Sequence, residues 1–272
     1  MGNPALTPTP MVTLTTDFGD RDHYVASMKG ALLSLNPSLK IIDITHQIAP
    51  HQIAEAAFTL GCAVPTFPDG TIHIVVVDPG VGTRRRLLLA STERHYFLAP
   101  DNGTLGLVFD AEPALQVVQL TQARYFRQDV SSTFHGRDIL APVAAHLSLG
   151  TDMSQFGDPV QDWMPCAFSA PVGPVAGRLG LKVLAVDRFG NVILNLKRRA
   201  YREAGGRPAP GALTLEIGGR TIRRLLLTYD EADDGEPFAL FNSCDYLEIA
   251  ARQGSAAAVL GVLAGHPATV VL

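Results

Sequence analysis

One carboxylate of the sequence follows an expected strand at the point where a parallel sheet binds its ligands. Residues 71–77 form a short β-branched run bounded by turn residues, which predicts a buried parallel strand. Asp78 follows directly, at the carboxyl end where open α/β sheets bind ligands. A Pro-Gly turn then folds the chain back, so that an arginine of the run 84–86 can return to this carboxylate. With His135, which precedes an expected helix, these residues predict a pocket that handles a proton.

A second carboxylate follows the first expected strand, residues 11–16. Asp17 can accept hydrogen bonds from two vicinal hydroxyls, as a ribose diol presents them. Asp22 has two interpretations, either as the N-cap of the following helix or as a substrate-binding group. The glycines here do not follow the GxGxxG spacing, so no dinucleotide-binding fingerprint is indicated.

The histidine and the arginines also have structural interpretations. A lone histidine beside a glycine is more often structural, and three consecutive arginines usually form a solvated face, of which only one needs to point inward. A helix N-terminus would lower the pKa of the His135 imidazole, whereas a nearby Asp78 would raise it, so the sign stays open. The remaining histidines lack HExxH or similar spacing, and no metal site is predicted.

Composition excludes several classes of protein. The 272 residues suffice for one large domain or two, and 47% apolar with 18% charged residues is typical of a globular chain. A net charge of −4 without long basic tracts argues against nucleic-acid binding. Three widely spaced cysteines are typical of reduced core residues. We expect a cytoplasmic protein, because neither a signal peptide nor a run approaching ~18 apolar residues is present.

The pattern of expected secondary structure divides the chain into two parts. After a flexible tail at 1–10, strands and helices alternate over 11–156, which predicts an α/β domain with a mainly parallel sheet. A proline-rich stretch, 157–175, is expected to be a linker, and 176–272 reads as a small all-β, barrel-like domain. The expected strands are 11–16, 39–44, 71–77, 87–91, 95–98, 115–120, 179–186, 192–196, 213–217, 222–227, 238–241 and 268–272; the expected helices are 24–35, 51–63 and 138–149.

The second half contains two polar segments between apolar runs, 186–192 and 241–250. The first reads as strand, turn and strand, and an ordinary turn explains its glycine and asparagine. From the residues alone, the sequence therefore predicts a two-domain protein with an acidic, histidine-containing pocket. It does not predict a substrate.

Together these segments resemble the S-adenosyl-L-methionine hydroxide adenosyltransferases, which are related to the fluorinating and chlorinating enzymes that use the same substrate. The resemblance runs in order from about Val12 to the C-terminus and rests on TTDFG, DITH, VVVDPGVGT-RR, APDNG, FHGRD, D-FGN and FNS…YLEIA. It implies an N-terminal α/β domain, a C-terminal β-barrel and a homotrimer with its active sites between subunits.

The resemblance also implies residue roles. The hydrolytic set would be Asp78, Arg85 and His135. The substrate-binding set would be Asp17 at the ribose, Asp22, Asp187 and Ser243 at the methionine end, and Phe189 and Asn191 at the adenine, with backbone near Ala251 and Gln253.

The halogenating relatives carry tyrosine or another non-acidic group where Asp78 stands, and the fluorinating ones carry serine where Gly136 stands. This chain therefore resembles the hydrolases. His51 stands where the fluorinating branch has a tryptophan beside the ribose.

The implied reaction is hydrolysis of S-adenosyl-L-methionine, a small-molecule substrate, to adenosine and L-methionine through attack of water at C5′ of the ribose. It needs no cofactor and no metal. The alternatives are a halide-dependent synthase of 5′-halo-5′-deoxyadenosine, a non-catalytic nucleoside-binding protein, and a metal-dependent hydrolase that uses Asp17, Asp78 and His135. The sequence predicts neither a nucleic-acid partner nor a membrane partner.

Overall fold

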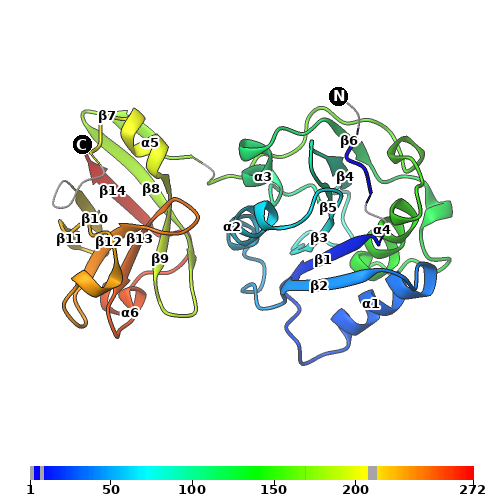
Figure 1. Cartoon of the computed structure of the whole chain (residues 1–272), viewed down its shortest axis with the longest axis horizontal. Helices are drawn as coiled ribbons and strands as arrows, with labels where there is room; N and C mark the ends of the chain where they lie inside the picture. The colour runs from blue at the N-terminus through cyan, green and yellow to red at the C-terminus, as the bar shows by residue number, and fades with distance from the viewer. Residues whose placement is uncertain (1–2, 7–8, 169, 208–212) are drawn as a thin grey trace. The chain divides into compact units, whose positions relative to one another are not determined.

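The computed structural model describes residues 3–6, 9–168, 170–207 and 213–272 and divides into two compact units, Met1–Ala167 and Phe168–Leu272 (Figure 1). Among these described residues, no helix is both long enough and apolar enough to cross a lipid bilayer.

The first unit is built on a six-stranded mixed sheet in the order β2-β1-β3-β5-β4-β6. β1 pairs in parallel with β2 and β3, β3 pairs in parallel with β5, and β4 runs antiparallel to both of its neighbours, β5 and β6. The sheet is thus mostly parallel. Its strands are β1 (Met11–Thr16), β2 (Lys40–Thr45), β3 (Ile72–Val76), β4 (Leu87–Ser91), β5 (Tyr96–Pro100) and β6 (Gln116–Gln119).

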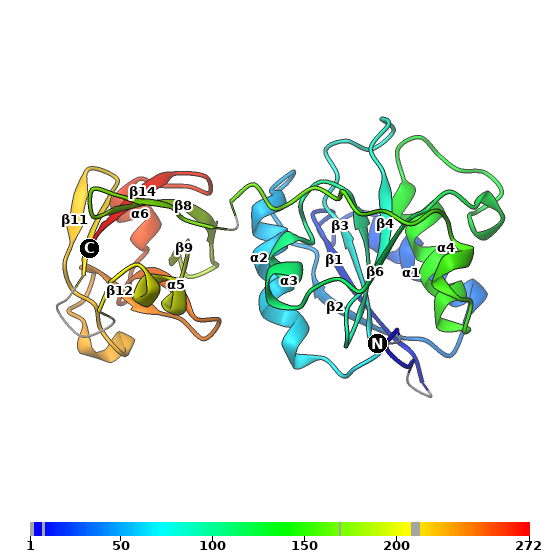
Figure 2. The same ribbon diagram turned by 90° about the horizontal axis from the view of Figure 1, so that it is seen from above.

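Helices cover both faces of this sheet. Figure 2 shows α1 and α4 on one face and α2 and α3 on the other. β3 is buried along its whole length, and its side chains alternate between two cores: Ile72 and Ile74 pack with the α1 and α4 side, and Val75 with the α2 and α3 side. The helices are α1 (Tyr24–Leu35), α2 (Ile53–Ala63), α3 (Gly106–Ala111), a π-helix (Gly136–Leu140) and α4 (Ala141–Ser148), with 3-10 turns at Val64–Thr66, Ala123–Tyr125 and Met153–Gln155.

The second unit is an eight-stranded antiparallel sheet in the order β11-β10-β14-β8-β9-β13-β12, with β7 paired to β8. Backbone hydrogen bonds of 2.8 Å join Ala239 of β12 to Arg224 and Leu226, just beyond β11, so the sheet is nearly closed. Its elements are β7 (Val172–Val175), β8 (Arg178–Val186), β9 (Val192–Lys197), α5 (Arg198–Glu203), β10 (Thr214–Ile217), β11 (Arg220–Ile222), a 3-10 turn (Tyr229–Glu231), β12 (Pro237–Phe241), β13 (Tyr246–Ala251), α6 (Ala256–Leu260) and β14 (Pro267–Val271).

Several element predictions were wrong. The strand expected at 222–227 lies instead at Arg220–Ile222; beyond it Leu225 makes an isolated bridge with Ala239, and a 3-10 turn with a Thr228–Glu231 capping box begins at Tyr229. The helix expected from 138 begins at Gly136 as a π-helix, and the one expected from 51 begins at Ile53. β13 occupies the second half of the segment taken as a polar loop, and β7 lies inside the range expected as a linker.

Candidate active site

A pocket of about 300 Å³ opens in the first unit at the carboxyl ends of β1 and β3. These strands are parallel neighbours, so the residues that follow them, Asp17 and Asp78, meet at one edge of the sheet. The pocket is lined by Asp17, Phe18, Tyr24, Pro50, His51, Val76, Asp78, Val81, Thr133, Phe134, His135 and Gly136.

The turn after β3 returns Arg85 to Asp78. Thr83 donates its backbone N–H to the Gly80 carbonyl at 3.1 Å and its hydroxyl at 2.7 Å, which closes the turn. Nε and Nη2 of Arg85 then donate to Oδ2 of Asp78 at 2.8 and 2.5 Å. Both side chains are largely buried, at 12% and 8% exposure. The prediction that one arginine of the run points inward is confirmed.

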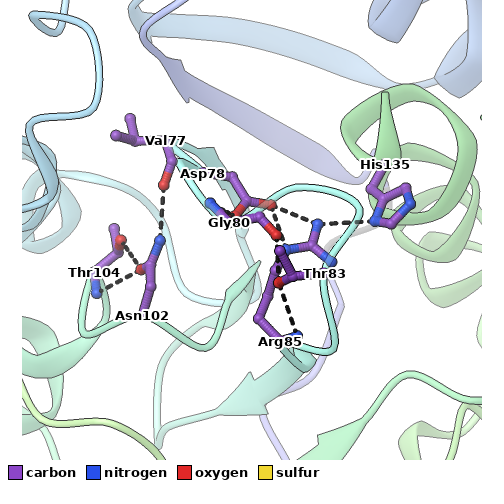
Figure 3. A network of polar contacts seen from close by, with 8 residues as sticks. All are labelled: Val77, Asp78, Gly80, Thr83, Arg85, Asn102, Thr104 and His135. Atoms are coloured by element: carbon purple, nitrogen blue, oxygen red, sulfur yellow. Dashed lines mark hydrogen bonds and ion pairs between the residues drawn. The ribbon is translucent and has the colours of Figure 1, made fainter. Parts of the chain in front are cut away.

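His135 joins Asp78 and Arg85 from another element. Nη2 of Arg85 lies 2.8 Å from Nδ1 of His135 (Figure 3). A guanidinium only donates hydrogen bonds, so Nδ1 must accept, and the neutral ring carries its proton on Nε2. Burial, followed by the charge of Arg85, lowers the pKa of His135 below its usual range, against the opposing effect of Asp78. The direction of the His135 pKa shift, which the sequence left open, is therefore downward.

Gly136 lets the π-helix start directly against the end of β3. A Cβ at this position would lie 3.2 Å from Sδ of Met28 and 3.3 Å from both methyl groups of Val76. Absence of a side chain therefore brings His135 to the same edge of the sheet as Asp78.

Asp138 fixes the loop that leads into His135, a role the sequence analysis missed. Its buried carboxylate accepts from the backbone N–H of Ser131 at 2.9 Å and from Nε of Arg137 at 2.6 Å. Those bonds, followed in effect by the charge of Arg137, overcome the cost of burial and lower the pKa of Asp138. The signal in the sequence was a charged residue inside an otherwise apolar helical pattern.

Asn102 is a second positioning residue that was missed. Its Nδ2 donates to the carbonyl of Val77, the residue before Asp78, at 2.8 Å. Its Oδ1 accepts from the backbone N–H and the hydroxyl of Thr104 (Figure 3). The turn after β5 therefore clamps the end of β3. The APDNG motif contained this residue, but only the tertiary contact reveals its partner.

Asp17 is held by one oxygen. Its Oδ2 accepts from the backbone N–H of His51 at 3.0 Å, and His51 adopts a left-handed φ of 68°. Oδ1 makes no hydrogen bond with the described part of the chain, so one oxygen remains to accept from a ligand. His51 lines the pocket.

Aromatic rings form one wall of the pocket. The Phe18, Tyr24 and Phe134 rings contact one another at centroid distances of 5.3 to 5.8 Å. Asp22 does not join this wall: it is exposed and does not line the pocket. Its N-cap interpretation is wrong, because the N-cap of α1 is His23, which makes no capping bond.

In the second unit, Asp187 organises the turn between β8 and β9. Its Oδ1 accepts from the backbone N–H groups of Phe189 and Asn191, both at 2.9 Å, and its Oδ2 accepts from Nδ2 of Asn191 at 2.9 Å. The turn presents the Phe189 ring, 76% exposed, while Asn191 is buried. The strand, turn and strand predicted for this segment are confirmed.

The remaining candidates lie before and after β13. Ser243 is exposed in a turn that Asn242 organises by accepting from the backbone N–H groups of Cys244 and Tyr246 at 3.0 and 3.1 Å. Ala251 ends β13, and its carbonyl accepts from Gly254 at 3.1 Å across Gln253, which has a φ of 53°.

Among the described residues, no group of three or more His, Cys, Asp and Glu side chains is placed to hold a metal ion. Asp17, Asp78 and His135 line one pocket without forming such a group.

Comparison with known proteins gives the family. The chain is 37% identical over 265 residues to an (R)-S-adenosyl-L-methionine hydrolase of Salinispora tropica, covering 96% of this chain and 97% of the relative. A fluorinase of Actinoplanes sp. is 26% identical over 300 residues, with 96% and 97% coverage. The crystal structure of an uncharacterized conserved protein from Thermotoga maritima matches with a TM-score of 0.85 and 32% identity, over 96% of this chain and 100% of that one.

Family models match both parts of the sequence. Residues 12–157 match the SAM hydroxide adenosyltransferase N-terminal domain, and residues 181–269 match the C-terminal domain of the same family. The chain belongs to the SAM hydroxide adenosyltransferase family.

Proposed function

We propose that this protein hydrolyses S-adenosyl-L-methionine to adenosine and L-methionine. The observation that carries the proposal is the position of the Asp78 carboxylate. Arg85 holds it just beyond the carboxyl end of strand β3, where it lines a pocket with Asp17. The family match and the hydrolase relatives support it. The resemblance described above also implies that the halogenating branch lacks an acidic group at this position.

The chemistry needs a base but no acid. As the oxygen of water bonds to C5′ of the ribose, the C5′–S bond breaks and its electron pair stays on sulfur, which leaves as a neutral thioether. The one proton to be removed is that of the attacking water. From the residues that the structure describes, Oδ1 of Asp78 accepts a single 3.2 Å hydrogen bond, donated by the Gly80 N–H, so it keeps a lone pair for this proton. Binding aligns water with the C5′–S bond.

In this mechanism His135 positions Arg85 rather than accepting the proton. Its Nδ1 lone pair is occupied by the Arg85 guanidinium, and its Nε2 is already protonated. Arg85 in turn fixes the orientation of the Asp78 carboxylate through two donors to one oxygen. Asp78 is therefore the general base of the proposal.

Substrate contacts follow the residues implied by the family. Asp17 would hold the ribose diol, supported by its unoccupied Oδ1, and the aromatic wall would shield the pocket from bulk solvent other than the attacking water. The methionine end would contact Asp22, Asp187 and Ser243; the adenine would contact Phe189, Asn191, Ala251 and Gln253. Asp187 already accepts three bonds within its turn, so it would act mainly by presenting its neighbours.

The proposal extends to assembly and location. The enzyme would work without a metal or cofactor, in the cytoplasm, as a homotrimer whose sites lie between subunits. Its domains would span 11–156 and 176–272 around a linker at 157–175, with the nearly closed sheet of the second unit forming a β-barrel.

An isotope experiment tests the reaction. Purified protein is incubated with S-adenosyl-L-methionine in ¹⁸O-water, and the products are separated and weighed by mass spectrometry. Adenosine labelled at its 5′ oxygen, with an equal amount of methionine, is the expected result. Unlabelled adenosine, or methylthioadenosine in its place, would refute direct attack by water.

A further inference from the structure

Glu248 is a buried carboxyl group that the proposed chemistry does not use. It lies within β13 and is only 4% exposed, in the run Tyr246-Leu247-Glu248-Ile249-Ala250. Its neighbours Leu247 and Ile249 belong to the core of the sheet, so Glu248 points to the opposite face, where a strand of this composition would otherwise carry an apolar side chain. Burying a charged group there is costly unless it is hydrogen-bonded.

Both oxygens of Glu248 are bonded to groups outside β13. Oε1 accepts from the phenol of Tyr229 at 2.7 Å, and Oε2 accepts from Nδ2 of Asn242 at 3.1 Å. Through Tyr229 the carboxylate holds the 3-10 turn that follows β11. Through Asn242 it holds the turn that presents Ser243, because the other end of the same amide accepts from two backbone N–H groups of that turn.

The groups that Glu248 holds are themselves exposed to solvent. The phenol of Tyr229 is tied to a buried oxygen, yet the residue as a whole is 48% exposed, so its ring is presented to solvent in a fixed orientation. The Phe238 ring packs against it in a T-shaped arrangement at a centroid distance of 6.1 Å. Ser243 is likewise exposed on a turn that is fixed from beneath. One carboxylate therefore fixes two surfaces that can contact a ligand.

We propose that Glu248 is a positioning residue for substrate binding: its carboxylate holds the Tyr229 ring and the turn of Ser243 in the arrangement that the substrate requires. This inference rests on the proposed hydrolysis of S-adenosyl-L-methionine. The candidate base Asp78 lies in the other unit, so loss of the Glu248 carboxylate should weaken binding and leave the chemical step intact.

Protonation provides a signature that a purely structural role would lack. Burial, with a smaller effect from the charge of Asp187, raises the pKa of Glu248 above its usual range; the Tyr229 and Asn242 bonds oppose this. Tyr229 and Asp187 are the other titratable groups that face it, and the pKa of Tyr229 is raised. As pH falls into the range where Glu248 gains a proton, one acceptor oxygen becomes a donor and conflicts with the Asn242 amide. KM should then rise in the wild type.

The experiment compares KM and kcat for S-adenosyl-L-methionine in the wild type, Glu248→Gln and Tyr229→Phe, each first checked by thermal melting. Glu216→Gln serves as the matched control, because it removes a half-exposed carboxylate of the same unit that pairs with Arg178. Glu248→Gln should raise KM about tenfold, the effect of one charge-assisted hydrogen bond, with kcat within about twofold. Its KM should also lose the rise at acid pH. Tyr229→Phe should raise KM in the same direction, and Glu216→Gln should change neither constant.

Each failure has a separate meaning. A wild-type protein that releases no adenosine would overturn the proposed function, and this inference with it. Normal wild-type turnover with unchanged KM in the folded Glu248 and Tyr229 variants would overturn the inference alone, as would a fall in kcat at constant KM. If Glu248→Gln does not fold, Tyr229→Phe decides the question, because it removes one hydroxyl and keeps the ring.

Discussion

At the residue scale, Arg85 determines how the other two members of its set can act. It donates to Asp78 and to His135 from the same guanidinium, and it cannot accept from either. Each partner is thereby fixed as an acceptor at the atom that faces Arg85. Asp78 has a second carboxylate oxygen that can still accept a proton, whereas the other ring nitrogen of His135 is already protonated. The directions of these hydrogen bonds therefore assign Asp78 as the proposed base.

Replacing Asp78 by Asn tests that assignment. The amide keeps the size of the carboxylate but cannot accept a proton, so kcat should fall by roughly 10²- to 10⁴-fold, the usual contribution of a general base. Adenosine release measures kcat, and adenosine titration should show unchanged product binding. Asp17→Ala is the converse control, because it should weaken adenosine binding through loss of a charge-assisted contact. A kcat within threefold of wild type would contradict the role of Asp78.

The pH dependence tests His135. Because its pKa is lowered from the usual 6.5, the ring stays neutral as pH falls through that value and accepts from Arg85 until a lower pH is reached. Below its own pKa the charged ring would repel Arg85 and activity should fall. We therefore expect kcat to be flat through pH 6.5 and to decline on the acid side of it. His135→Gln retains an acceptor that does not titrate, so its decline should begin at still lower pH. A wild-type decline centred at 6.5 would argue against the geometry.

At the element scale, the parts of the site that follow from the sequence are the ends of strands. β1 and β3 are short, β-branched runs that stop at turn residues, so the positions of Asp17 and Asp78 were predictable from local pattern alone. The return of Arg85 was predictable for the same reason, since a Pro-Gly turn is encoded within a few residues.

The contacts that were not predictable join segments far apart in the sequence. Asn102 bonds a carbonyl 25 positions away, and no local pattern encodes that partner. The π-helix at Gly136 was hidden because its apolar spacing differs little from that of an α-helix. β13 was missed because Glu248 interrupts an apolar run with a charge whose partners lie in other segments.

Packing at the start of the π-helix gives a stability prediction. Gly136→Ala places a methyl group 3.2 to 3.3 Å from Met28 and Val76, so the free energy of unfolding should fall by about 1–3 kcal/mol. Gly30→Ala is the matched control: it lies within α1 with nothing within 4 Å of the added carbon, and should be neutral or stabilising by up to ~1 kcal/mol. Urea denaturation of both variants measures the difference. Equal stabilities of the two variants would show that β3 and α1 can move apart around the added methyl group without a cost in free energy.

A buried histidine pair makes the first unit sensitive to acid. His73 and His95 are fully buried with their ring centroids 5.0 Å apart, and within the described part of the chain Nε2 of His73 and both nitrogens of His95 lack hydrogen-bond partners. Burial, then repulsion from His95, lowers the pKa of His73 from 6.5 to about 3. The unfolded state therefore takes up a proton below pH 6.5 while the folded state does not, so stability is lost as pH falls from 6.5 toward 3.

The loss should be on the order of a few kcal/mol between pH 7 and pH 4. Urea denaturation at the two values measures it. His73→Leu should remove much of the difference, whereas His51→Leu, at an exposed position, should leave it unchanged. A His73→Leu protein with the full wild-type pH dependence would assign the effect elsewhere.

At the scale of the whole molecule, the catalytic candidates lie in one unit and most of the binding candidates in the other. If sites form between subunits, two inactive variants should complement each other. Mixing Asp78→Asn with Asn191→Ala should then restore part of the adenosine-forming activity, because some sites would combine one intact unit from each chain. Absence of recovery after verified subunit exchange would place each site within a single chain.

The choice of nucleophile also belongs to this scale. A halide about 4 Å from the Asp78 carboxylate would meet roughly 4 kcal/mol of repulsion at an effective dielectric constant near 20, which Arg85 offsets in part. Water avoids this repulsion and can release a proton, whereas chloride has none to give. Chloride should be a poor substrate and a weak inhibitor even at high concentration. Formation of 5′-chloro-5′-deoxyadenosine as fast as adenosine would favour the halogenase alternative.

The contact between Arg85 and Nδ1 of His135 also makes the imidazole a spectroscopic reporter. A neutral ring with one unprotonated and one protonated nitrogen gives two well-separated ¹⁵N resonances, whereas a charged ring gives two similar ones. Binding of substrate, loss of Arg85 or collapse of the turn after β3 would each shift the resonance of the unprotonated Nδ1 first. Nitrogen NMR of labelled histidine would thus follow the assembly of this site in the resting enzyme, before any bond is made or broken.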